Sequence, residues 1–149
     1  MSEFSLKPFP CGDKVTNAFT KFLTRYWPSG VPAPDVAQAL DLFPSQPVPA
    51  GFTPQKTWKD PWPFNDRAGV YLIYSAEFDL LYVGTAQYLG ARLSGHFGSG
   101  KDCVPRGKWS KPPRFVISIA VPEDVPFEAP ALEGFLIGEL GPPDNFKGK

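Results

Sequence analysis

Two tyrosines in a predicted β-hairpin are the first residues of this chain whose types and spacing could do chemistry. Residues 69–75, GVYLIYS, and 80–84, LLYVG, are rich in the β-branched and aromatic residues that favour strands. The four residues between them, AEFD, predict the turn of an antiparallel hairpin. Tyr71 and Tyr82 lie on separate strands of this hairpin, so whether they meet depends on the pairing register.

We expect the register that places the two phenols together. Pairing Ser75 with Leu80 sets Tyr71 opposite Gly84 and puts Tyr82 on the same face of the sheet. Two phenols beside a glycine would make a concave polar spot on a rigid floor. A slip of one residue would instead put the tyrosines on opposite faces.

A second group of polar side chains follows in residues 88–97, whose pattern predicts a helix. Tyr88, Arg92 and His96 are spaced by four, so they form a strip that offers a phenol, a guanidinium and an imidazole. Taken alone, Arg92 would be a solvated surface arginine, and His96, the only histidine, a capping or core-edge residue. The apolar stripe beside this strip consists of Leu89, Leu93 and Phe97.

A carboxylate beside an apolar stripe is the third chemical feature. Residues 128–140 predict a helix, in which Glu133 is flanked by Leu136 and Ile137 at i+3 and i+4. A carboxylate in such a place is costly unless something pairs with it. The candidate partners are a divalent metal, Arg92 or another cation, and a plain salt bridge is the alternative to metal binding.

The loop of residues 98–113 begins the one concentrated basic stretch of the chain, and its glycines and prolines break any regular pattern. Lysine and arginine would neutralise phosphates, and the indole of Trp109 could stack on a base. An ordinary solvated loop is the alternative. The candidate DNA contacts are Lys101, Arg106, Lys108, Trp109, Lys111 and Arg114.

These features together resemble the GIY-YIG nuclease family. GVY followed by LYVG is similar to the two name-giving motifs, with Val70 and Val83 in place of isoleucines. The resemblance covers about residues 69–145, and its separated landmarks occur in the family's order. The further landmarks are Arg92 and His96 in ARLSGHF, Glu133 in ALEGFLIGEL, and Asn145 in GPPDN, just after the pair of prolines.

The resemblance implies an endonuclease that hydrolyses DNA phosphodiester bonds with one divalent metal, Mg²⁺ or Mn²⁺, held by Glu133. Arg92 would clamp the phosphate and Tyr71 would take a proton from the attacking water, although the two tyrosines could exchange roles. Tyr82 and His96 would position or assist, and Asn145 would orient the glutamate or a phosphate oxygen. The implied catalytic set is Tyr71, Tyr82, Arg92, His96, Glu133 and Asn145.

Two other functions stay open at this point. The first is a DNA-binding module of the same fold that does not cut, and the second is a protein-interaction module. The sequence also leaves open whether a nuclease of this kind would serve restriction, repair, a mobile element or a toxin.

The elements that must position these side chains make an α/β (α+β) domain. A third strand, residues 114–121, is apolar on both faces and is therefore central. The order ββαβα predicts a small three-stranded, mainly antiparallel sheet flanked by helices, which the resemblance also implies. We place the nuclease domain at residues 66–149, with an N-terminal helical and Pro-rich extension, residues 1–65, packed on it.

The predicted extension consists of two helices and a strap. Apolar spacing predicts an amphipathic helix over residues 13–27 and a short helix over residues 34–43. Residues 44–63 contain six prolines together with Trp58 and Trp62, which indicates an extended segment laid over the domain. A partner protein could bind through residues 44–63 instead.

Composition limits the remaining possibilities. The 149 residues suffice for one compact domain with a small appendage. Fifteen basic residues balance fifteen acidic ones, so DNA binding would depend on local positive patches. No signal segment and no membrane-length apolar run is visible, which favours the cytoplasm and no membrane partner, without excluding signal-independent export. The oligomeric state is not predicted.

Overall fold

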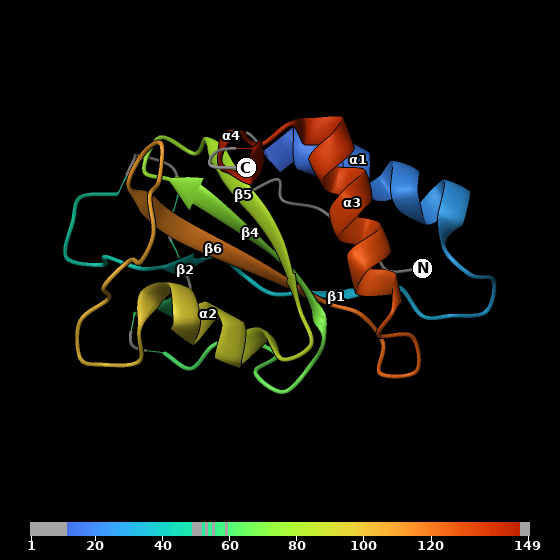
Figure 1. The fold of residues 1–149 in the computed structure, drawn as a ribbon, viewed down its shortest axis with the longest axis horizontal. Helices are drawn as coiled ribbons and strands as arrows, with labels where there is room; N and C mark the ends of the chain where they lie inside the picture. Colours follow the sequence, from blue (N-terminus) through green and yellow to red (C-terminus); the bar gives the residue numbers. More distant parts are fainter. Residues whose placement is uncertain (1–11, 49–51, 53, 55, 59, 147–149) are drawn as a thin grey trace.

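The sheet is built around β4 (Gly69–Ser75), a strand buried along its whole length. It pairs antiparallel with β5 (Leu80–Ala86) on one side and with β6 (Pro113–Ala120) on the other. This arrangement comes from a computed structural model that describes residues 12–48, 52, 54, 56–58 and 60–146 (Figure 1). A strand covered on both faces needs apolar side chains in both directions, which explains the nearly continuous apolar run.

The hairpin register is confirmed at the tyrosines and wrong at the turn. Tyr71 lies opposite Gly84 as expected, but the register shifts after Ile73 and pairs Tyr74 with Leu80. The Ser75 N–H instead bonds the carbonyl of Asp79 at 2.9 Å, which tightens the turn. Phe78 adopts a left-handed φ of 65°, which is costly for this residue type. The Phe78 ring is buried and stacks on Phe115 at a centroid distance of 5.2 Å, which offsets the cost.

The sheet has six strands, whereas three were predicted, and the expected helix over residues 34–43 is absent from this part of the structure. Its place is taken by β1 (Asp35–Val36) and β2 (Leu40–Asp41), which both pair antiparallel with β6. A further short strand, β3 (Lys56–Thr57), lies parallel to β2. The side of β6 away from β4 would otherwise leave backbone groups unpaired, and satisfying them outweighs a weak helical pattern.

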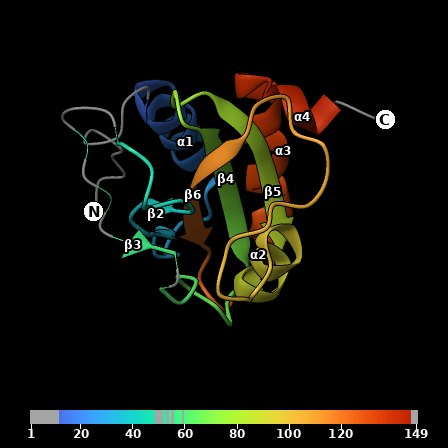
Figure 2. The ribbon, with the colours of Figure 1, turned by 90° about the vertical axis from the view of Figure 1, so that its left-hand side faces the viewer.

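Helices cover both faces of this sheet. The helices α1 (Gly12–Tyr26) and α3 (Glu128–Leu140) pack together on one face, and α2 (Leu89–Phe97) packs on the other (Figures 1 and 2). The short α4 (Pro143–Phe146) ends the described chain beside β5. The helices predicted over residues 13–27, 88–97 and 128–140 are confirmed. In the described part of the chain, no helix is long and apolar enough to span a bilayer.

The described part of the 44–63 segment is attached to α2 and to the loop that follows it; residues 49–51, 53, 55 and 59 of the predicted strap lie outside the described residues. The Trp62 indole N–H donates to Oγ of Ser94 on α2 at 3.2 Å. The Trp58 indole N–H donates to the carbonyl of Lys101 at 3.1 Å, and the two indoles meet edge to face. Both tryptophans therefore make contacts within the chain.

Arg114 is a structural residue, which corrects its assignment as a DNA contact. It is 3% exposed and forms a two-pronged ion pair with Asp41, itself 1% exposed, at 2.6 and 3.0 Å. Its guanidinium also donates to the carbonyls of Gln46 and Pro47. These bonds tie the N-terminal segment to the start of β6, so the guanidinium does not face solvent.

Replacing Arg114 by methionine should lower the free energy of unfolding by about 3–5 kcal/mol, because Asp41 is left buried without its partner. The matched control is Lys21→Met, which removes an exposed pair with Glu139 and should cost about 0–1 kcal/mol. Urea denaturation of both variants measures the difference. Equal stabilities of the two variants would contradict the structural role of Arg114.

Candidate active site

The two phenols form the floor of the site. The rings of Tyr71 on β4 and Tyr82 on β5 lie on one face, with centroids 6.1 Å apart. The Tyr71 ring leans across β5 at Gly84, where an added Cβ would collide with its Cζ and hydroxyl. Glycine at this position is therefore what allows the phenol to lie flat against the sheet.

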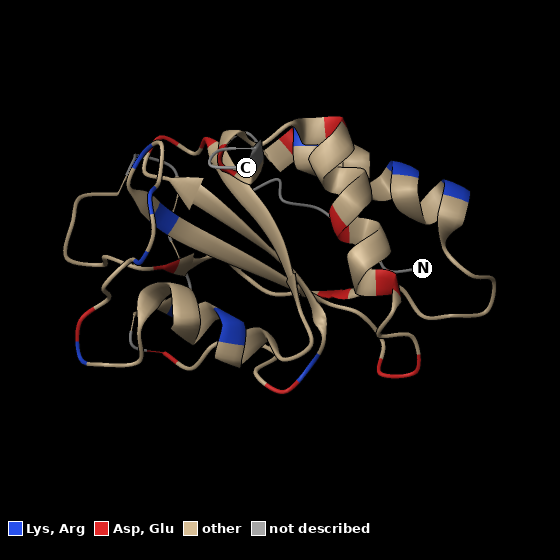
Figure 3. Cartoon of the chain, viewed as in Figure 1, with Lys and Arg blue, Asp and Glu red and all other residues tan. Residues whose placement is uncertain are grey.

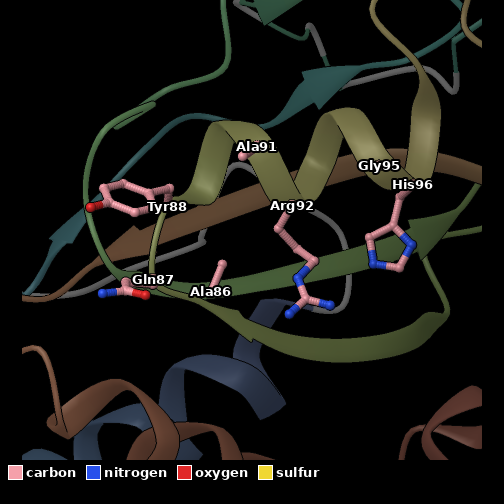
Figure 4. A pocket seen from close by; sticks show the side chains of 7 residues that line it. All are labelled: Ala86, Gln87, Tyr88, Ala91, Arg92, Gly95 and His96. Atoms are coloured by element: carbon pink, nitrogen blue, oxygen red, sulfur yellow. The ribbon is translucent and has the colours of Figure 1, made fainter.

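The helix α2 supplies the wall. Tyr88, Arg92 and His96 lie in a row along it and line an open hollow of about 500 Å³ (Figure 4). Arg92 is exposed, so its guanidinium is accessible to a ligand in the hollow. On the other side of α2, the predicted core stripe is completely buried: Leu89, Leu93 and Phe97. The buried stripe sets the orientation of α2 on the sheet. Because Tyr88, Arg92 and His96 are spaced by four, this orientation also sets where their side chains lie.

A hydrogen bond between Tyr71 and His96 joins floor and wall. The Tyr71 hydroxyl lies 2.8 Å from Nε2 of His96, a hydrogen bond whose donor depends on the imidazole tautomer. Burial, and to a lesser extent the charge of Arg92, lower the pKa of His96 from its usual 6.5. The imidazole is therefore neutral near pH 7 and can accept a proton.

The Tyr71 phenol is held in its protonated form. Burial raises its pKa well above the usual 10, and the neighbouring Tyr82 and the charge of Glu133 raise it further. Arg92 lowers this pKa, but by less than burial raises it. A free phenolate is consequently not available at neutral pH in the protein alone.

Glu133 is half-buried on α3, which lies on the opposite face of the sheet from α2, yet its charge acts on Tyr71. Among the described residues, no three acidic, histidine or cysteine side chains gather into a metal-binding group. A single carboxylate cannot complete the coordination of a metal ion by protein ligands alone. The carboxylate of Glu133 does fit a hard cation such as Mg²⁺, which keeps several waters and takes further oxygens from a substrate.

Asn145 lies outside the hollow, because its amide is committed to the backbone of β5. Its Oδ1 accepts from the Val83 N–H and its Nδ2 donates to the Val83 carbonyl, both at 2.8 Å. Gly141 ends α3 with a left-handed φ of 56° and so turns the chain back to the sheet. Asn145, 7% exposed, thus docks α4 on the edge strand β5, and its predicted part in orienting Glu133 or a phosphate oxygen stays a prediction.

The loop between α2 and β6 exposes some, not all, of the predicted DNA contacts to solvent outside any ion pair of the described residues. Lys101, Arg106 and Lys108 are exposed, whereas Lys111 is paired with the Asp79 carboxylate. Figure 3 shows basic and acidic residues interspersed over the fold, with several basic residues spaced along the loop between α2 and β6.

Trp109 of the same loop is part of the site. Its half-buried indole stacks on Phe97 at a centroid distance of 6.2 Å and meets the rings of Tyr82 and His96 at 6.0 and 5.8 Å. Its indole N–H donates to the carbonyl of Arg106. The position of Trp109 beside the two catalytic candidates could not be inferred from sequence, because it depends on the path of an irregular loop.

Comparison with known families agrees with this geometry. Residues 67–147 match the GIY-YIG catalytic domain. The chain belongs to the GIY-YIG family. The match covers more than half of the chain and includes the hairpin, α2, β6 and α3, so the predicted resemblance is confirmed. A GIY-YIG domain indicates a nuclease that acts on DNA. No curated protein and no solved structure matches the chain.

Gly84→Ala should displace the Tyr71 ring, because the new methyl group would occupy the space of the phenol. We expect the free energy of unfolding to fall by about 1–3 kcal/mol and DNA cleavage to be lost at temperatures where the variant stays folded. The matched control is Gly138→Ala on α3, where an added Cβ meets nothing within 4 Å and should raise stability slightly. Wild-type cleavage and stability in Gly84→Ala would show that the ring does not need this glycine.

Proposed function

We propose that this GIY-YIG protein is a divalent-metal-dependent endonuclease that hydrolyses phosphodiester bonds in DNA. The observation that carries the proposal is the hydrogen bond between Tyr71 and a neutral His96, at the edge of a hollow that Arg92 also lines. His96 then offers a proton acceptor and Arg92 a fixed positive charge, and the carboxylate of Glu133 on α3 lies close enough for its charge to act on Tyr71. These are the groups that phosphodiester hydrolysis requires.

Arg92 binds the scissile phosphate. A guanidinium presents several N–H donors in one plane and pairs well with phosphate oxygens. Its charge is fixed, so it also stabilises the extra negative charge that develops on the phosphate in the transition state. The buried side of α2 fixes the helix in the core and so holds the Arg92 charge in place while DNA binds.

Tyr71 and His96 act together on the attacking water. The Tyr71 oxygen accepts a proton from the water while its own proton passes to Nε2 of His96, 2.8 Å away. This route avoids a free phenolate, which burial disfavours. It uses the His96 tautomer whose Nε2 carries no proton. Tyr82, whose ring contacts both residues, positions them.

Glu133 holds Mg²⁺ or Mn²⁺ in this proposal. When bound, the cation supplies charge that stabilises the phosphate and leaving oxygens. The exposed Lys101, Arg106 and Lys108 contact DNA phosphates further from the cut, and Lys111 joins them if its pair with Asp79 opens. Trp109 holds the rings of Tyr82 and His96 in place through the contacts that it makes with them in the protein alone.

Incubating the purified protein with plasmid DNA and Mg²⁺ tests the function, and Glu133→Gln tests the metal ligand. The amide keeps the size of the carboxylate but binds Mg²⁺ poorly, so cleavage should vanish while the fold and DNA binding persist. Glu139→Gln, on the same helix but paired at the surface with Lys21, should cut like wild type. Full activity of Glu133→Gln after chelation and Mg²⁺ add-back would contradict the assignment.

The relay predicts a specific pH dependence of single-turnover cleavage. The rate should be low where His96 is protonated, rise as the imidazole loses its proton, and then stay level instead of climbing on toward the range in which a phenol ionises. Protonated His96 cannot accept the proton of Tyr71, so the rate is low. Once His96 is fully deprotonated, a further increase in pH does not raise the rate. His96→Gln should slow cleavage and lose the acid limb, and Tyr71→Phe should slow it about 10²- to 10⁴-fold.

Tyr82→Phe is the internal control for this relay, because it removes the same atom from the neighbouring strand and should have a smaller effect. A larger loss in Tyr82→Phe than in Tyr71→Phe would mean that the two tyrosines exchange roles. A wild-type rate that keeps rising toward pH 10 would show that Tyr71 itself ionises, and the relay would be wrong.

A further inference from the structure

Tyr88 occupies the N-cap position of α2 without acting as a cap. Its backbone is extended, with φ −130° and ψ 105°, and its side chain makes no capping hydrogen bond. N-cap positions favour Ser, Thr, Asp or Asn, whose short side chains bond the free N–H groups of the first turn. A tyrosine contributes nothing of this kind, so local helix stability does not explain the residue.

The chain supplies the missing cap from another segment. The N–H groups of Leu89 and Gly90 donate to the carbonyls of Arg67 and Asn65, each at 3.0 Å. Gly90 allows this approach, because an added Cβ would collide with the side chain of Asn65. Backbone carbonyls just before β4 thus satisfy the start of α2, and position 88 is released from capping.

The released side chain stands at the rim of the hollow. Tyr88 is 55% exposed, one of the few large apolar side chains open to solvent among the described residues, and it lines the same hollow as Arg92 and His96 (Figure 4). Tyr88 precedes Arg92 by four positions, about one turn of helix or roughly 6 Å along the axis. The Tyr88 ring points past the start of α2, away from the Arg92 guanidinium, so the two side chains lie at different places along the hollow (Figure 4). A strand whose phosphate lies at Arg92 and which runs toward the start of α2 would bring a base to the phenol ring.

We propose that Tyr88 stacks on an unpaired base next to the scissile phosphate, and that the substrate is DNA with an unpaired nucleotide at the cut. This inference rests on the proposed endonuclease function. Bases inside an intact duplex are covered on both faces by their neighbours, so an exposed ring finds a free base face only at a gap, flap or end. With fifteen basic and fifteen acidic residues, the protein has little net charge to attract duplex, and stacking adds affinity that phosphate contacts do not supply.

The test measures DNA binding in a chelating buffer, where the probe stays uncut. One probe carries 2-aminopurine as an unpaired base in a gap, and the second carries it in a fully paired duplex of the same sequence. Tyr88→Asn removes the ring and installs a preferred, uncharged N-cap residue, so thermal stability should hold or rise. Tyr88→Phe keeps the ring, and Tyr26→Asn changes a 57% exposed tyrosine on α1, on the opposite side of the sheet.

Wild type should bind the gapped probe more tightly than the duplex and quench its 2-aminopurine fluorescence. Tyr88→Asn should bind the gapped probe about 5- to 150-fold more weakly and lose the quenching, the range expected for one stacked base. Tyr88→Phe and Tyr26→Asn should behave like wild type.

Wild-type binding and quenching in Tyr88→Asn, with plasmid cleavage by wild type intact, would overturn the stacking role and leave the nuclease standing. An equal loss on the paired duplex would overturn the unpaired substrate. A wild-type protein that neither binds the probes nor cuts plasmid would overturn the endonuclease function together with this inference.

Discussion

The Tyr71 phenol is constrained on two sides, and the site depends on both constraints. On one side its ring leans over Gly84, which leaves no room for any other residue type there. On the other its hydroxyl bonds His96, on a helix whose opposite stripe is rooted in the core. The hairpin register brings Tyr71 to Gly84, and the packing of α2 brings His96 to Tyr71. A change in either would separate the two groups by more than a hydrogen bond can span.

Burial outweighs the Arg92 charge at Tyr71 and acts in the same direction as that charge at His96, so both side chains stay uncharged. Burial disfavours the phenolate and the imidazolium alike, whereas Arg92 favours the former and disfavours the latter. In the proposed reaction a bound phosphate offsets the charge of Arg92. The imidazolium that forms at His96 is then less costly with DNA in place than without it, which links proton transfer to substrate binding.

Aromatic packing connects this site to the N-terminal segment and to the basic loop. Trp58 meets Trp62, Trp62 meets Phe97 on α2, and Phe97 stacks on Trp109, which contacts His96. The Asp41–Arg114 pair ties the same N-terminal segment to β6. The extension is thus held to the fold from both the helix and the sheet, and its described residues contribute three strands, β1, β2 and β3, to the sheet itself.

The sequence by itself determined the features that follow from local periodicity. The hairpin, the row of Tyr88, Arg92 and His96, and the helix of Glu133 were predictable because spacing alone decides which side chains share a face. The family followed from the order of the same residues, and the match to the GIY-YIG catalytic domain confirms it.

Only the tertiary structure decided the features whose partners lie far away in the chain. Arg114 is buried because it meets Asp41, 73 residues earlier, and Asn145 is engaged because it meets Val83, 62 residues earlier. The segment around β1 and β2 is extended because β6 offers it backbone partners, which its own apolar pattern does not reveal. Hydrogen bonds across such separations satisfy groups that burial would otherwise leave unpaired, and this gain outweighs the local preferences that a sequence pattern reports.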